Sequence, residues 1–164
     1  MARTAENLAL KYGASTLKAR LAGLLHDIAR VWAPDELMRY AATRGLPVSQ
    51  LERAAPVLLH ARVAADIVKS DFGLQDAELL QAIERHTLAV TDMSDLDKIV
   101  YIADSLEPSR RFEGRGALVA AVGRSLDEGM LACLKSSLQY SVLRGLPLAH
   151  ATVDAYNELL SRRG

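Results

Sequence analysis

The feature that most constrains the fold is the abundance of alanine and leucine in short apolar runs that end at glycine or begin at proline or serine. Residues branched at Cβ are sparse, so the composition favours helices over strands. Apolar residues recur at helical spacing, and no segment alternates as a half-buried strand does. The sequence therefore predicts an all-α protein, and its 164 residues form a single domain of ordinary size.

Glycine, proline and capping residues predict where the helices begin and end. A polar segment at 107–116, rich in arginine, separates two groups of helices. The long stretch near the C-terminus contains Gly123, where a break is expected. The expected helices cover residues 1–12, 15–28, 34–45, 56–72, 76–86, 94–107, 117–144 and 152–161.

Charge and composition exclude several classes of function. The formal net charge is zero, which argues against a nucleic-acid polymer as partner but leaves room for a local arginine cluster. No apolar run reaches the ~18 residues of a membrane span, and the N-terminus lacks the apolar block of a signal peptide. We therefore expect a cytoplasmic protein without a membrane partner. We expect the single cysteine, Cys133, to be buried as a small apolar side chain.

Five polar side chains stand where the pattern calls for apolar ones: His26, Asp27, His60, His86 and Asp104. Buried carboxylates need a cationic partner, which an arginine or a lysine could supply. A divalent metal would account for the carboxylates and the histidines together, because imidazole and carboxylate bind zinc, iron and manganese. Hydrogen-bonded core histidines, helix caps and ion pairs are the alternative interpretation of the same residues.

Longer segments resemble a known family. Residues 22–30, AGLLHDIAR, resemble the signature of HD-domain phosphohydrolases. LLH at 58–60, AIERHT at 82–87 and MSDLDKIVYIADSLEPSR at 93–110 follow with the order and spacing of the bacterial YqeK family. Members of that family are HD-domain symmetrical diadenosine tetraphosphate hydrolases. GLPLAH at 145–150 and TVDAYN at 152–157 also fit, so the resemblance covers essentially the whole chain.

The resemblance implies one HD-domain helical bundle over residues 1–164 with two divalent metal ions, iron being expected and manganese or zinc being compatible. His26, Asp27 and Asp104 would hold one ion, and His60 and His86 the second, with Asp27 bridging. The implied reaction cleaves diadenosine tetraphosphate into two ADP through a metal-bound hydroxide. Two metal ions can activate a water molecule and clamp the attacked phosphate.

Three further side chains are candidates for contact with the substrate. Arg110 is the strongest candidate for stabilising phosphate charge, since its guanidinium can bind two oxygens at once. Arg30 lies one helical turn after His26 and is a second candidate, with a surface ion pair as its alternative role. Thr87 either shapes the site or ends its helix.

One departure from the family pattern leaves two interpretations open. The family carries a further metal-binding histidine on its first helix, upstream of a segment like 4–9, and this sequence does not contain it. His150 matches a different family position and is expected to be structural. We expect that the first helix is incomplete in this sequence. The alternative is a degenerate nucleotide-binding or regulatory module without a full metal site.

Two other questions stay open at the level of sequence. An HD phosphohydrolase that acts on another nucleotide would use the same metal centre, because base preference depends on the shape of the pocket. The apolar stretch at 117–144 could contribute to a homodimer, and it is equally well explained as part of the core.

Overall fold

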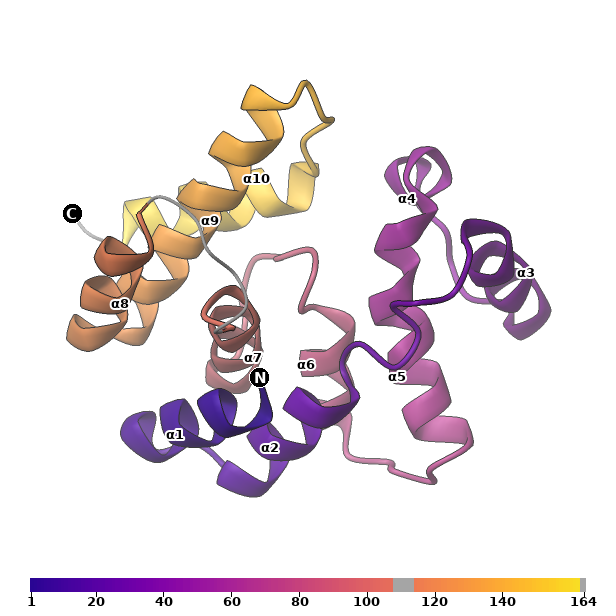
Figure 1. Ribbon diagram of the computed structural model, residues 1–164, viewed down its shortest axis with the longest axis horizontal. Helices are drawn as coiled ribbons and strands as arrows, with labels where there is room; N and C mark the ends of the chain where they lie inside the picture. The colour runs from indigo at the N-terminus through magenta and orange to yellow at the C-terminus, as the bar shows by residue number, and fades with distance from the viewer. Residues whose placement is uncertain (108–113, 163–164) are drawn as a thin grey trace.

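The computed structural model describes residues 1–107 and 114–162, and within these ranges it contains helices and no strand. Figure 1 shows their arrangement. The all-α prediction is confirmed. The α-helices and the one 3₁₀ helix, η1, are α1 (Ala2–Tyr12), α2 (Thr16–Leu25), α3 (Pro34–Arg44), α4 (Gln50–Ala54), η1 (Pro56–Leu59), α5 (His60–Ser70), α6 (Ala77–Glu84), α7 (Asp95–Ser105), α8 (Arg115–Arg124), α9 (Leu126–Leu143) and α10 (His150–Ser161).

Local capping determines most of these boundaries. Gly13 ends α1 in the left-handed conformation, with φ of 73°, which glycine adopts without steric cost. Ser15 begins α2 by accepting a hydrogen bond from the backbone N–H of Lys18. Ser94 and Asp97 form a reciprocal capping box at the start of α7. The sequence predicts each of these ends correctly.

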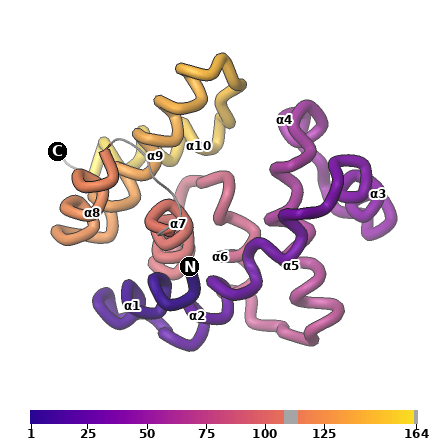
Figure 2. The backbone as a smooth tube through the Cα atoms, viewed as in Figure 1, coloured from indigo at the N-terminus to yellow at the C-terminus, as the bar shows by residue number. Residues whose placement is uncertain are grey.

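Helix α7 lies at the centre of the molecule (Figure 1). It packs against α1, α2, α6 and α9, and α9 in turn packs against α8 and α10. The backbone tube shows α3, α4 and α5 on the opposite side from the α8–α10 group (Figure 2). One large buried cluster joins α1, α2, α5, α6, α7, α8, α9 and α10. A smaller cluster packs α3 against η1 and α5 and consists of Ala29, Leu37, Ala41, Leu59, Val63 and Ile67.

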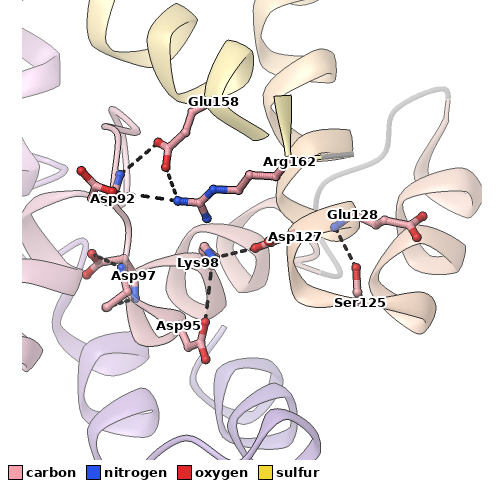
Figure 3. Close-up of polar contacts among 10 residues, drawn as sticks. Asp92, Asp95, Asp97, Lys98, Ser125, Asp127, Glu128, Glu158 and Arg162 are labelled. Atoms are coloured by element: carbon pink, nitrogen blue, oxygen red, sulfur yellow. Dashed lines mark hydrogen bonds and ion pairs between the residues drawn. The ribbon is translucent and has the colours of Figure 1, made fainter. Parts of the chain in front are cut away.

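A buried lysine joins α7 to α9. Lys98 is 7% exposed and donates to Oδ1 of Asp127 at 2.6 Å, while Asp95 lies 3.8 Å away on the same helix (Figure 3). At the end of α10, Arg162 pairs with Glu158 one helical turn earlier (Figure 3). Lys98 therefore helps to hold the central helix α7 against α9.

The second helix is shorter than the sequence predicts. The helix ends at Leu25, with His26 as its C-cap, whose N–H donates the last α-helical hydrogen bond to the carbonyl of Ala22. Tighter turns follow, in which the N–H of Ile28 donates to the carbonyl of Leu25 and that of Arg30 to Asp27. His26 and Asp27 therefore lie in these turns and not within the helix. Two apolar residues of α2 also face solvent, since Leu17 is 67% and Leu24 64% exposed.

The helix expected at 56–72 is divided into two parts. Pro56–Leu59 forms the 3₁₀ turn η1, and α5 begins at His60. A proline cannot donate a backbone hydrogen bond, which suits it to the first position of such a turn. The short helix α4 before it was not predicted, because five residues carry too little periodicity to be recognised.

The stretch expected at 117–144 forms two helices that pack against each other, α8 and α9. The break falls at Ser125, which caps α9 by accepting from the N–H of Glu128, and not at Gly123, which lies inside α8. Cys133 on α9 is buried, as predicted. In the part of the chain that the structure describes, no helix combines the length and apolar character needed to cross a membrane.

Candidate metal centre

Three buried histidines meet at one point, and the backbone holds each ring in the same way. His26, His60 and His86 are 6%, 4% and 4% exposed. In each ring, Nδ1 lies near the carbonyl oxygen of the residue three positions earlier: Gly23 at 3.2 Å, Val57 at 2.5 Å and Ile83 at 2.7 Å, respectively. A carbonyl oxygen only accepts, so Nδ1 carries the proton and Nε2 is left as the donor atom for a ligand.

The Nε2 atoms of His60 and His86 lie 3.1 Å apart. With both Nδ1 atoms protonated, two nitrogen lone pairs would face each other unless a cation lies between them. Burial lowers the pKa of His86, which favours its neutral, ligand-competent form. This pair therefore fits a bound metal ion better than a simple hydrogen bond.

Asp27 lies among all three imidazoles. Its Oδ1 is 3.1 Å from Nε2 of His60 and 3.4 Å from Nε2 of His86, and its Oδ2 is 3.4 Å from Nε2 of His26. Burial raises the pKa of Asp27, but the interactions of its carboxylate with the imidazoles of His60, His86 and His26 outweigh burial and hold the pKa well below its usual value. Oδ1 of Asp104 lies 3.7 Å from Nε2 of His26.

The ends of four helices bring these side chains together. His26 and Asp27 follow α2, His60 begins α5, His86 follows α6, and Asp104 lies in the last turn of α7. The ligand atoms of His26, Asp27 and His86 all lie within 4.8 Å of one another. Neutral imidazoles and carboxylates at this separation are donors suited to zinc, iron or manganese, so the residues present fit a divalent metal.

Gly23 allows the close packing behind His26. A Cβ built at Gly23 would lie 2.6 Å from the Cα of Ala2, so α1 and α2 can approach here only in the absence of a side chain. The carbonyl of the same glycine holds Nδ1 of His26. The start of α1 is therefore tied to the orientation of one candidate ligand.

A buried aspartate joins the end of α6, which His86 follows, to the start of α7. Asp97 is fully buried, and its Oδ2 accepts from Gln81 at 2.8 Å, from Arg85 at 3.0 Å and from the N–H of Ser94 at 3.0 Å. Because Arg85 immediately precedes His86, these bonds hold the end of α6 against the start of α7.

A cavity of about 540 Å³ opens onto this cluster. Among the residues proposed from sequence, its walls include Asp27, Arg30, His60, His86, Thr87 and Asp104. His26 lies behind this surface. Arg110 and Arg111 lie outside the described residues, and Arg115 donates to the carbonyl of Leu106 at 3.0 Å. His150 is at the surface, at the start of α10, apart from the cluster.

Helix α9 contributes a wall of the cavity that sequence reasoning missed. Cys133, Ser136, Ser137 and Tyr140 line it. The sequence around these serines gave no clear signal, because α9 carries other polar residues such as Lys135 and Gln139, and Ser137 is exposed. Tyr140 is 57% exposed at the rim.

The family model described as "HD domain" matches residues 1–109 of this chain. The protein belongs to the HD domain family. The match contains every helix end that carries a candidate ligand, and α8, α9 and α10 lie beyond it.

Relatives of this HD-domain protein align over almost its full length. It is 32% identical over 158 residues to the symmetrical bis(5′-nucleosyl)-tetraphosphatase of Bacillus subtilis, covering 96% of this chain and 84% of that one. It is 33% identical over 157 residues to the protein of the same name from Halalkalibacterium halodurans, covering 96% and 83%. The HD-domain protein is therefore homologous to bacterial symmetrical tetraphosphatases.

A solved structure supports the same assignment. The crystal structure of a predicted HD superfamily hydrolase of Clostridium acetobutylicum, described as involved in NAD metabolism, superposes with a TM-score of 0.93. The two chains are 34% identical, and the match covers 98% of this HD-domain protein and 85% of the other chain. The fold resemblance thus extends past residue 109 to the α8–α10 group.

Proposed function

We propose that this protein is a metal-dependent hydrolase that cleaves diadenosine tetraphosphate symmetrically into two ADP. One observation carries the proposal: three buried imidazole Nε2 atoms and two carboxylates converge, and His60, His86, Asp27 and Asp104 of this group line an open cavity. The homology to symmetrical tetraphosphatases supplies the substrate class. A structural cluster would have no need of a cavity of about 540 Å³ beside it.

The proposed ligands form two sets that share Asp27. His26, Asp27 and Asp104 hold the first ion, and His60 and His86 hold the second. Support comes from the two oxygens of Asp27, since Oδ1 lies near His60 and His86 while Oδ2 lies near His26. We expect iron in both positions, and manganese or zinc would accept the same donors.

When bound, two divalent ions lower the pKa of a water molecule and neutralise phosphate charge. The chain's own residues keep the site ready for them. The backbone carbonyls retain the Nδ1 protons of the histidines, so the Nε2 atoms stay available. Asp27 remains ionised at neutral pH because its pKa is held low.

The reaction consumes one water molecule for each substrate. The water oxygen forms a new bond to one of the two central phosphorus atoms, and the bond from that phosphorus to the central bridging oxygen breaks. One ADP leaves with the bridging oxygen, the other carries the water oxygen, and both protons of the water are released when the two ADP molecules are fully ionised. Arg30 at the cavity wall and Thr87 are proposed to bind phosphate oxygens, and Arg110 to stabilise the charge on the leaving ADP.

Product analysis tests this function. Protein purified without oxygen and supplied with iron or manganese is incubated with diadenosine tetraphosphate, and the nucleotides are separated by chromatography. ADP as the sole product is the expected result. ATP with AMP would show asymmetric cleavage and contradict the proposal. No turnover with any of the metals, in protein shown to bind metal, would favour a binding module instead, and turnover of other nucleotides alone would reassign the substrate.

A further inference from the structure

A second cavity, of about 790 Å³, lies beside the candidate metal centre. Residues of α4, α5 and α6, of the segment after α6 and of the start of α10 line it. It shares two wall residues, Leu58 and Thr87, with the cavity over the metal centre. The two hollows are therefore neighbours divided by a common wall.

The dividing wall is made of residues next to the candidate metal ligands in the chain. Thr87 directly follows His86, and Leu58 stands two residues before His60. An extended molecule whose middle is held at the metal centre could therefore pass over this wall and place one end in the second cavity.

The arginines of the second cavity are held by carboxylates. Both arginines of the second cavity are already paired: Arg62 donates from Nε to Glu84 at 3.1 Å and from Nη1 to Glu52 at 3.3 Å. Arg85 donates to Asp97 at 3.0 Å. With its positive charge neutralised by carboxylates, this cavity suits an uncharged group better than a phosphate chain.

The rest of its wall mixes apolar surface with side-chain amides. Apolar surface comes chiefly from Leu51, Leu58, Leu80, Leu88, Val90 and Leu148, and Gln50 and Gln81 add amides. A nucleoside presents a flat apolar base together with hydroxyl and amine groups, which this lining matches. Pockets of roughly 300–1,000 Å³ accommodate one drug-sized ligand, so each cavity has room for one nucleoside.

We propose that the second cavity binds one nucleoside of a dinucleoside polyphosphate, while the other nucleoside occupies the cavity over the metal centre and the phosphates lie between them. This inference rests on the proposed function, because only a substrate with two nucleosides needs both cavities. It assigns substrate selection to residues of α4, α6 and the start of α10.

The test places a bulky side chain in the second cavity by substituting an exposed residue of its wall. Ala151 lies exposed in the first turn of α10 and lines the cavity, so Ala151→Trp adds an indole without displacing a buried side chain. Ala77→Trp does the same from the first residue of α6 and serves if the first variant fails to fold. Ala120→Trp, exposed on α8 and outside both cavities, is the matched control.

Two constants are measured for each variant with the metal-loaded protein: the KM for diadenosine tetraphosphate and the inhibition constant of adenosine 5′-tetraphosphate, which has one nucleoside. We expect Ala151→Trp to raise the KM by roughly tenfold or more, as lost pocket contacts do. The inhibition constant should change far less, and Ala120→Trp should change neither. An unaltered KM, or a parallel rise of both constants, would overturn the subsite while leaving the proposed function intact. If the unmodified protein does not hydrolyse diadenosine tetraphosphate, the proposed function itself fails.

Discussion

Oδ1 of Asp27 lies 3.1 Å from Nε2 of His60, joining the turn after α2 to the first residue of α5. The other oxygen of the same carboxylate faces His26. A single side chain thus contacts imidazoles on both sides of the cluster. Asp27 is therefore the residue whose change should affect the whole centre.

Asp27→Asn keeps the shape of the side chain and removes its charge. We expect the variant to lose bound metal and to hydrolyse diadenosine tetraphosphate more than ~100-fold more slowly, since even residues outside the ligand shell cost 10–100-fold. Metal content and initial rates are the measurements. Asp35→Asn, at an exposed position on α3, is the control and should retain both. Full activity of Asp27→Asn would show that the bridging role is wrongly assigned.

Gly23→Ala should destabilise the fold by about 1–3 kcal/mol, because its new methyl group would overlap the backbone of Ala2. Gly123→Ala, in an open position of α8, is the matched control and should be neutral or stabilising by up to ~1 kcal/mol. Urea unfolding followed by circular dichroism measures both. Equal stability of the two variants would mean that α1 does not pack against α2 as described.

Asp66 on α5 should make a pH-dependent contribution to stability. Burial raises its pKa, but hydrogen bonds from Arg44 and Tyr40 outweigh burial and leave the pKa below its usual value. A carboxyl whose pKa is lower in the folded state stabilises the fold above the unfolded pKa of about 4, and the effect is lost as pH falls through the folded pKa.

Asp66→Asn should therefore cost about 1–3 kcal/mol at pH 7, and its difference from the unmodified protein should shrink below about pH 4. Unfolding free energies measured across this pH range test the sign. Asp154→Asn, exposed on α10, is the control. A difference that grows as the pH falls would contradict the described contacts.

Cys133 should be inert in the folded protein although it lines the cavity. It is 3% exposed, and burial raises the pKa of its thiol to about 12, so almost no thiolate is present near neutral pH. Iodoacetamide at pH 8, followed by mass spectrometry, should modify the protein only after unfolding. A Ser161→Cys variant supplies an exposed thiol as the positive control. Rapid modification of the native protein at Cys133 would show that α9 opens more readily than its packing suggests.

Sequence alone predicts much of the fold because local chemistry sets most helix ends. The left-handed Gly13 and the Ser94–Asp97 capping box act within one turn and are readable from neighbouring residues. The exposure of Leu17 and Leu24 was not readable, since it depends on which face of α2 meets α1, α6 and α7. The spacing of apolar residues predicts a helix, but it does not show how much of the helix surface neighbouring helices bury.

The residues of the candidate site were also identified from local sequence patterns. The five candidate ligands stand out as polar residues in apolar runs, and the structure brings them together, although their role as ligands remains a prediction. Ser136 and Ser137 were missed because they reach the cavity only through the packing of α9 against α7. The second cavity likewise depends on the start of α10 lying near α4 and α6, which no short segment encodes.

The metal content of the protein tests the central claim most directly. Protein purified under anaerobic conditions is analysed by inductively coupled plasma mass spectrometry, and the metal-to-protein ratio is determined. The His26, Asp27, His60, His86 and Asp104 cluster predicts close to two divalent ions per chain, with iron as the main element. Less than one ion per chain after reconstitution with iron, manganese or zinc would contradict a two-metal centre.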